Sequence, residues 1–376
     1  MKITIVGPTY PYRSGVSHYM TLLFRELKKK HDVCFYSFSR QYPSFLFPGK
    51  NDRDQTSQFH IREDGVRYEI DSLNPVTWFR VASRILNVKP DCVILPWWTV
   101  YWCLLYFCLI CMLKKDRNIK IIFLCHNIYD HDASWIQKVL AAAILRLGDH
   151  FIVHSEDCRM AMFRIKSTAD VSVVSHPEYS IFNQNRMTDE QAKESLNLKG
   201  NILLHFGVIR PYKGIDDLIA AMPEVLKRVD ATLLVVGERW RGFDIEAQLA
   251  KYPGIESRVR LVTNYIPNEE VERYFRAADV VVLPYVETSA SGVLQVALAF
   301  DKPVIGTETG ALKDVIHDGM NGYLVPVRNP QRLADKIVRF FTENKKTEFS
   351  GNIKNMKNQF AWSNMAQCIE RFVNHE

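Results

Sequence analysis

The chain alternates between short apolar runs and amphipathic stretches. Short unbroken apolar runs predict buried strands, and apolar residues that recur every three or four positions predict helices. The first run, Lys2–Val6, leads through a glycine-bearing loop to a helix from about Val16 to Lys29, which is the opening unit of a doubly wound parallel sheet. Later elements of this series are strands at 33–38, 92–95, 119–125, 149–154 and 171–175 and a helix at 75–86. The pattern predicts about six or seven parallel strands with helices on both faces.

A polar stretch from His176 to Lys199 interrupts the alternation and predicts an interdomain connection, with an amphipathic piece at 189–196. The second series of strands is predicted at 201–206, 232–236, 259–262, 280–283, 303–306 and 322–325. After Asn329 the pattern is helical to the end, and Trp362 opens the last helix. Residues 40–65 are polar and rich in turn formers, so a long surface excursion is expected there.

These patterns predict an α/β protein with two Rossmann-like doubly wound domains that face a central cleft. The N-terminal domain is expected at 1–180 and the C-terminal domain at 181–360. Residues 361–376 are expected to form a helix that returns to the N-terminal domain. The length of 376 residues supports this division, because one core rarely serves so long a chain.

Composition narrows the functional classes. The chain is 47% hydrophobic and 24% charged, as in globular proteins. Its net charge of +6 suits an anionic ligand or a membrane surface but is weak evidence for nucleic acid. The eight cysteines show no disulfide framework, and Pro8 and Pro11 interrupt any signal-peptide core, so a cytoplasmic protein is expected.

One segment, 93–113, is apolar enough to be considered as a membrane span. It contains Pro96 and Thr99, whereas a span needs about 20 unbroken apolar residues, so a strand, a turn and a buried helix are expected. The aromatic run at 97–102 is followed by Leu104, Leu105, Tyr106 and Phe107 and then by cations at 114–117, and this stretch leaves two interpretations open. The aromatics either fill the first core or contact the inner face of a membrane peripherally.

Candidate chemistry is concentrated at 283–301. A strand ends at Leu283, a polar turn carries Glu287, and a helix begins near Gly292. Free backbone N–H groups and the positive end of the helix dipole make such a turn suited to an anion. A capped helix beside a core strand is the alternative interpretation.

A second loop carries two positively charged side chains. A strand ends at Phe206, Gly207 permits a tight turn, and Arg210 and Lys213 precede a helix. Two cations at the carboxyl end of a strand suit a diphosphate, although surface positions would explain either cation alone. A third strand ends in His126-Asn127, which is either a site or a structurally bonded strand end.

The second half of the chain resembles the nucleotide-sugar domain of retaining glycosyltransferases of the GT-B fold, in particular glycosyltransferase family 4 (glycosyl transferases group 1). The matching motifs are a G-x5-K-G phosphate loop (Gly207, Lys213, Gly214), ADVVVLP at 278–284, an E-x7-E element beginning at Glu287, PVIGTETG at 303–310 and DGMNG at 318–322. In the first half, Ser14-Gly15-Val16 resembles the family's N-terminal glycine loop, and His126 resembles its strand-end histidine.

The resemblance implies transfer of a hexosyl group from a nucleoside diphosphate sugar to a glycan or lipid-linked glycan in cell-envelope polysaccharide synthesis, with retention and without a metal or other cofactor. Arg210 and Lys213 would stabilise the leaving diphosphate, Glu287 would hold sugar hydroxyls, and His126 would position the donor sugar. Further donor-binding candidates are Gly15, Gly207, Tyr265, Ile266, Ser289, Ser291, Gly292, Val293, Leu294 and Gln295. The acceptor-binding candidates are His18 and Asn127, and no metal ligand is expected.

Three departures from the family pattern leave alternatives open. Thr288, Ser289 and Ala290 replace the glycines that usually follow the first Glu, and the two hydroxyls would supplement backbone donors to the phosphate or the sugar. Gln295 stands where the second Glu of E-x7-E is usual, and Val208 stands where an Arg usually follows the loop glycine, so Arg210 is the substitute. The Gln295 replacement motivates a non-catalytic binding subunit of a glycan-assembly complex. A sugar-nucleotide epimerase on the same fold is the other alternative, with Asp130, His131 and Asp132 as its acid and base groups. The oligomeric state, the nucleotide base and the sugar are left open.

Overall fold

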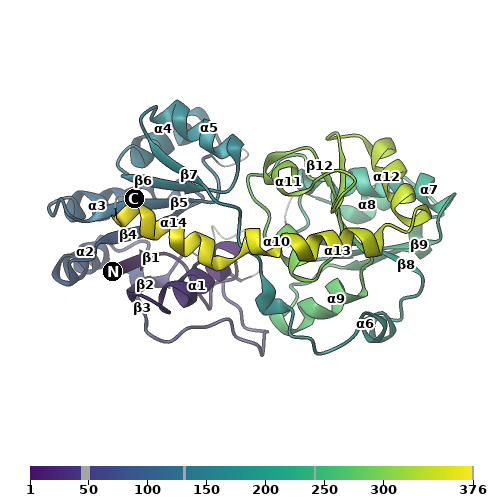
Figure 1. The fold of residues 1–376 in the computed structure, drawn as a ribbon, viewed down its shortest axis with the longest axis horizontal. Helices are drawn as coiled ribbons and strands as arrows, with labels where there is room; N and C mark the ends of the chain where they lie inside the picture. The colour runs from purple at the N-terminus through teal and green to yellow at the C-terminus, as the bar shows by residue number, and fades with distance from the viewer. Residues whose placement is uncertain (44–50, 130–132, 241–242, 375–376) are drawn as a thin grey trace. The chain divides into compact units, whose positions relative to one another are not determined.

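The computed structural model describes residues 1–43, 51–129, 133–240 and 243–374. The chain divides into two compact units; in Figure 1 the N-terminal unit runs from purple to teal and includes the yellow final helix, and the C-terminal unit runs from teal to yellow. The N-terminal unit comprises 1–55, 60–175 and 361–376, and the C-terminal unit comprises 56–59 and 176–360. Each unit is built on its own parallel sheet with helices packed against it, which confirms the predicted fold class.

The N-terminal sheet has seven parallel strands in the order β3-β2-β1-β4-β5-β6-β7. Its strands are β1 (Lys2–Val6), β2 (Asp32–Arg40), β3 (Val66–Asp71), β4 (Cys92–Trp97), β5 (Lys120–Cys125), β6 (His150–Val153) and β7 (Asp170–Val173). Its helices are α1 (Gly15–Leu27), α2 (Pro75–Val88), α3 (Cys103–Leu113), α4 (Trp135–Leu145), α5 (Glu156–Ile165) and α14 (Trp362–Asn374). The sequence pattern missed β3, an edge strand whose side chains are mostly exposed or half-buried.

Local signals explain where these helices begin. Ser14 accepts a hydrogen bond from the Ser17 amide at the start of α1, and Asn74 accepts one from Val76 at the start of α2. Pro75 occupies the first turn of α2, where a missing N–H costs nothing. These caps satisfy amides that have no partner inside the helix.

Two apolar layers sandwich the N-terminal sheet. Helices α2, α3, α4 and α5 pack on one face, and α1 and α14 pack on the other. Trp97 and Trp102 are fully buried in the first layer, and the Trp97 indole donates to the Ile128 carbonyl at 3.1 Å. Of the two interpretations of the aromatic run, core filling therefore holds for Trp97 and Trp102.

The C-terminal sheet has six parallel strands in the order β10-β9-β8-β11-β12-β13. They are β8 (Asn201–Phe206), β9 (Ala231–Val236), β10 (Val259–Val262), β11 (Val280–Leu283), β12 (Val304–Thr307) and β13 (Gly322–Val325). The helices of this unit are α6 (Asp189–Ser195), α7 (Ile215–Leu226), α8 (Ile245–Leu249), α9 (Val271–Ala277), α10 (Gly292–Ala299), α11 (Gly310–Val315), α12 (Pro330–Thr342) and α13 (Lys346–Met356).

The described part of the predicted excursion is 40–43 and 51–65; its first residue, Arg40, ends β2, and the other described residues belong to no named helix or strand. It is not all surface, because Ile61 is buried and residues 56–59 pack with the C-terminal unit. The Glu269 carboxylate accepts from the backbone amides of Gln58 and Phe59, and the Ser57 hydroxyl accepts from the Asn268 amide. A short piece of the first half is thereby fixed beside the turn after β10.

Two expectations from the sequence concern a membrane-spanning helix and disulfide bonds. Among the described residues, every helix is too short or too polar to cross a bilayer. All eight cysteines lie in described segments, and none is paired in a disulfide. The segment at 93–113 is strand β4, a 3-10 turn (Val100–Trp102) and helix α3, in the expected order, but α3 is only partly buried because Leu104 and Phe107 are exposed.

Candidate functional site

The strongest site candidate lies where the direction of strand order reverses in the C-terminal sheet. Strands β8 and β11 are neighbours there, and the chain leaves them in opposite directions. Ligands of doubly wound sheets bind at the carboxyl ends of such strands. The loop after β8, residues 207–214, touches the loop after β11, because the Val286 amide donates to the Tyr212 carbonyl at 2.8 Å.

Gly214 permits this close approach. It adopts the left-handed conformation at φ 63°, and a Cβ there would lie 1.9 Å from the carbonyl oxygen of Pro284. A larger residue would force the two loops apart. The glycine of the predicted phosphate loop is therefore required by the contact between the loops.

Lys213 lies at the junction of these loops. Its Nζ is 3.7 Å from the centroid of the Tyr285 ring, which follows β11. Burial, helped by the nearby positive charge of Arg210, lowers the pKa of Lys213 to about 7. An anion placed here would supply the negative charge that this ammonium lacks.

Arg210 is held between aromatic rings. Its guanidinium lies 5.3 Å from the centroid of Tyr212 and 5.2 Å from that of Trp240. Trp240 follows β9, and its indole donates to the Glu238 carboxylate at 3.3 Å. Both distances are within the range of cation–π attraction, which holds the guanidinium near the two rings.

Helix α10 begins beside the loop after β8. A Cβ on Gly207 would lie 3.2 Å from Cγ2 of Val293, in the first turn of the helix. Ser291 caps α10 by accepting from the Leu294 amide at 3.2 Å. The amides of Gly292 and Val293 have no carbonyl partner within a helix of this geometry, and they add partial positive charge beside the two cations.

Glu287 is exposed on the turn before α10. The turn is braced by Thr288, which is buried and donates to the Ala290 carbonyl at 2.8 Å. Thr307 donates to the Tyr285 carbonyl at 2.5 Å from the next strand. The half-buried Ser289 lies between these braced positions. The carboxylate therefore projects from a fixed turn.

Gln295 is 1% exposed on α10, and its side-chain oxygen has no hydrogen-bond partner among the described residues. A buried amide oxygen without a partner is costly, and a ligand hydroxyl could satisfy it. Tyr265 and Ile266 are half-buried in the turn after β10, the edge strand of the same sheet. Leu294 is buried.

Gly15, His18, His126 and Asn127 belong to the N-terminal unit. Gly15 opens α1 with nothing within 4 Å of a Cβ placed on it, so packing does not demand glycine there. His18 is on the same helix, and burial lowers the pKa of its imidazole to about 4 even though Asp54 opposes the shift. His18 is therefore neutral near pH 7.

His126 and the half-buried Asn127 follow β5, and His126 lies in an aromatic cluster. The ring centroid of His126 is 4.8 Å from that of Tyr19 and 5.7 Å from that of His154, which follows β6. His154 is bonded through Nδ1 to the Val174 carbonyl, and burial lowers the pKa of His154 to about 4. The sequence analysis missed His154, although its place after a buried strand was a usable signal.

Other neighbours of the site were also missed. Tyr212, Trp240 and Tyr285 position the two cations, and only their spatial packing identifies them. Asp130, His131 and Asp132, the groups considered for an epimerase, lie outside the described residues. Among the residues that the structure describes, no group of three or more His, Cys, Asp or Glu side chains could hold a metal ion.

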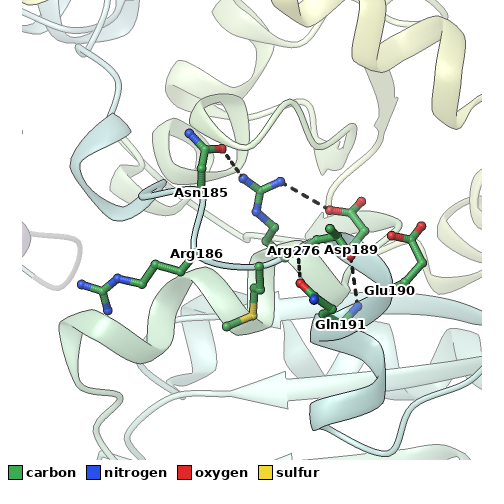
Figure 2. A pocket seen from close by; sticks show the side chains of 8 residues that line it. Asn185, Arg186, Asp189, Glu190, Gln191 and Arg276 are labelled. Atoms are coloured by element: carbon green, nitrogen blue, oxygen red, sulfur yellow. Dashed lines mark hydrogen bonds and ion pairs between the residues drawn. The ribbon is translucent and has the colours of Figure 1, made fainter.

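A hollow of about 460 Å³ lies elsewhere in the C-terminal unit, around α6 and α9 (Figure 2). It contains none of the predicted site residues. Arg276 crosses it and donates to Asn185 at 2.6 Å and to Glu272 at 3.2 Å, with Asp189 3.8 Å away. The charge of Arg276 is thus neutralised by its own neighbours, and the hollow is a structural junction.

Two models of glycosyltransferase families match the chain. Residues 13–177 match the model of Glycosyltransferase Family 4, and residues 200–343 match that of Glycosyl transferases group 1. The chain belongs to the GT-B glycosyltransferases.

Similar proteins support the assignment to the GT-B glycosyltransferases. A D-inositol 3-phosphate glycosyltransferase of Frankia alni is 31% identical over 196 residues, which cover 49% of this chain and 48% of the relative. An N-acetyl-alpha-D-glucosaminyl L-malate synthase of Bacillus anthracis is 27% identical over 180 residues, which cover 48% of this chain and 46% of the relative. The chain thus matches about half the length of these curated relatives.

Solved structures of other proteins share the fold of this protein over the whole chain. HepE of Anabaena in complex with UDP has a TM-score of 0.77 at 18% identity and covers 100% of both chains. Sucrose-phosphate synthase of Thermosynechococcus elongatus has a TM-score of 0.74 at 18% identity and covers 100% of this chain and 99% of its own. At such identities the likeness establishes the GT-B fold alone.

Proposed function

We propose that this glycosyltransferase moves a hexosyl group from a nucleoside diphosphate sugar to an acceptor hydroxyl, with retention at the anomeric carbon. The observation that carries the proposal is the loop at 207–214, which carries Arg210 and Lys213 and contacts both the loop after β11 and the first turn of α10. Two cations and a helix N-terminus are suited to a diphosphate. HepE, which shares the fold, was crystallised with UDP and UDP-glucose, so UDP-sugars are the first donors to test.

In the proposed reaction, the bond from the anomeric carbon to the diphosphate oxygen breaks as the acceptor oxygen bonds to the same face of that carbon. The acceptor proton leaves with the diphosphate. Lys213, Arg210 and the α10 amides would stabilise the negative charge that develops on the leaving group. Because these groups supply the positive charge, we propose that no metal is needed.

The other candidate residues have roles within the same proposal. Glu287 would hold hydroxyls of the donor sugar, and the buried oxygen of Gln295 would accept from a ribose hydroxyl. Tyr265 and Ile266 would contact the nucleobase. His126 would position the donor sugar, while His18 and Asn127 would contact the acceptor. A glycan or lipid-linked glycan of the cell envelope, reached from the cytoplasmic side of a membrane, is the proposed acceptor.

The test begins with thermal shifts for UDP-, GDP- and ADP-sugars, followed by turnover of the donors that bind, with and without a chelator. We predict that Lys213→Ala lowers donor affinity about tenfold to a hundredfold and lowers turnover as well, since a charge-assisted contact contributes roughly 1.5–3 kcal/mol. Lys251→Ala, at an exposed lysine of the same unit, is the matched control. Unchanged affinity in Lys213→Ala would contradict the placement of the diphosphate.

A non-catalytic binding protein is the second candidate, and Gln295 motivates it. Such a protein would bind a nucleotide sugar without cleaving it, so no free nucleotide would be produced with any acceptor. Gln295→Glu separates the two functions, because it restores the usual carboxylate of the family. Nucleotide release by the unmodified chain would exclude the binding protein. Release that appears only in Gln295→Glu would support it.

A further inference from the structure

An unusual concentration of exposed apolar side chains covers three neighbouring helices of the N-terminal unit. Of the thirteen large apolar residues that are exposed in the described chain, eight lie on α2, α3 and α4, and one, Met320, lies in the C-terminal unit. The eight are Val76, Phe79, Leu104, Phe107, Trp135, Ile136, Val139 and Leu140. We call them the apolar face.

The three helices form a continuous layer. Helix α2 packs against α3, and α3 packs against α4, all on the same side of the sheet (Figure 1). Each helix is apolar on its inner side as well, so its outer apolar stripe is not needed for the core. Large apolar clusters on a surface usually mark an interaction site.

Helix α4 is the clearest example of a helix that is apolar on both its inner and its outer side. Its inner side packs Ala141, Ile144 and Leu145 into the core. Its outer side presents Trp135, which is 74% exposed, and Val139, which is 58% exposed one turn later. The usual surface helix has charged residues on that side.

Charge indicates which partner would cover the apolar face. Helices α2, α3 and α4 contain no Asp or Glu, whereas Arg80 and Arg84 are exposed on α2. Lys114, Lys115 and Arg117 follow α3 and are also exposed, with Asp116 among them. Arg84 is paired with Glu69 and Lys114 with Asp149, so Arg80, Lys115 and Arg117 carry the charge argument. A surface of tryptophan and aliphatic side chains flanked by cations matches an interface with anionic lipid.

We propose that the apolar face docks on a bilayer that contains anionic lipid. Trp135 and its aliphatic neighbours enter the region between head groups and acyl chains, and the flanking cations lie at the lipid phosphates. The inference deepens the proposed function by naming the surface through which a lipid-linked acceptor is reached, but it rests on residues of the N-terminal unit alone. Of the stretch predicted from the sequence, Trp97 and Trp102 are buried, whereas Leu104 and Phe107 are exposed on α3 and belong to the apolar face, which extends to α2 and α4.

The experiment is flotation of the full chain with vesicles of phosphatidylcholine alone and of phosphatidylcholine with one third phosphatidylglycerol. We expect binding to the anionic vesicles that weakens when salt rises from about 0.1 M to about 0.5 M. Trp135→Glu with Val139→Glu should lower partitioning about tenfold or more. Met320→Glu, which places the same charge on an exposed apolar residue of the other unit, should leave it unchanged.

A second pair of variants isolates the charge. Lys115→Glu with Arg117→Glu should reduce binding to the anionic vesicles, and Lys199→Glu with Lys251→Glu in the C-terminal unit should not. Circular dichroism and thermal melting establish that each variant is folded. Absence of vesicle binding by the unmodified chain, or full binding by Trp135→Glu with Val139→Glu, would overturn the proposal.

Self-association and donor binding are two further measurements that test the proposal. If the unmodified chain ignores vesicles but self-associates, and Trp135→Glu with Val139→Glu makes it monomeric, the apolar face is covered by a second copy and the lipid proposal is wrong. Donor binding is measured on the same samples, because the Lys213 loop lies in the C-terminal unit. In the unmodified chain, donor binding without vesicle binding refutes the docking surface alone, and vesicle binding without donor binding refutes the donor site alone.

Discussion

Lys213 is a residue whose chemistry is set by burial. A lysine in water carries its proton far above neutral pH, but the pKa of Lys213 is lowered to about 7 because the ammonium is desolvated and lies near Arg210. A diphosphate beside it would reverse this shift by stabilising the charged form. The residue is thus suited to respond to an anionic ligand.

We predict that the affinity for a UDP-sugar falls as pH rises above about 7, by up to about tenfold per pH unit. In the free protein Lys213 loses its proton there, whereas the complex retains it, so binding takes up a proton. Titration calorimetry at pH 8 in buffers of different ionisation enthalpy measures that uptake. Lys213→Arg should bind without proton uptake, because a guanidinium does not titrate. Equal uptake by both proteins would show that another group is responsible.

Glu287 gives a second prediction at the level of single residues. Glu287→Gln should reduce turnover by at least about tenfold and leave the affinity for the bare nucleoside diphosphate within about twofold, because the charged contact is made with the sugar. Calorimetry with UDP and steady-state kinetics with the UDP-sugar measure the two quantities. Equal losses in both would place Glu287 on the nucleotide instead.

Among the elements, the two loops at β8 and β11 depend on glycine. Gly214→Ala should destabilise the protein by roughly 1–3 kcal/mol or more, because its φ of 63° disfavours a side chain and the added Cβ would meet the Pro284 carbonyl. Donor binding should fall as well, since Lys213 precedes Gly214. Chemical denaturation measures the change in stability.

Gly351 provides the matched control for this prediction. It lies within α13, and nothing is within 4 Å of a Cβ placed on it. Gly351→Ala should therefore raise the free energy of unfolding, by up to about 1 kcal/mol, through the helix preference of alanine. If Gly214→Ala behaved like Gly351→Ala, the loops would not be in the contact described above.

Across the whole molecule, each unit contains a buried histidine that is neutral when folded. Burial lowers the pKa values of His154 and His205 to about 4, and Nδ1 of His205 is 3.0 Å from the Val282 carbonyl oxygen. The unfolded chain takes up these protons below its ordinary histidine pKa of 6.5, whereas the folded chain does not until about 4. Stability should therefore fall as pH falls through this window.

We predict a loss of about 1.4 kcal/mol per pH unit for each such histidine. His205→Asn should make stability less dependent on pH between 6.5 and 4, and the substitution of the exposed His60 by Asn should not. Denaturant unfolding at several pH values measures both. The titration of Asp279 does not interfere with this measurement. Burial raises its pKa, but hydrogen bonds and ion pairs with Lys193 and Lys346 outweigh burial and hold the pKa below 3.8, which is outside the pH window of 6.5 to 4. An identical pH dependence in His205→Asn would contradict the prediction.

Much of the fold follows from local pattern. Short apolar runs such as 280–283 are typical of strands that are buried on both faces of a parallel sheet, whereas the longer apolar run at 103–113 forms helix α3. The order of strand, loop and helix then places Gly207, Lys213 and Glu287 at strand ends before any coordinates are known. The edge strand β3 escaped this reasoning, because its exposed side chains give no apolar run.

The sequence by itself determined the two sheets, the loops that carry the cations and the family. Tertiary structure decided which side chains meet. Tyr285 beneath Lys213, Trp240 beside Arg210 and His154 beside His126 come from separate strands, and their spacing along the chain does not encode a contact. Burial has the same origin, because the neighbours of a residue in space determine how much water it loses. That is why Trp97 and Trp102 lie in the core while Trp135 lies in solvent.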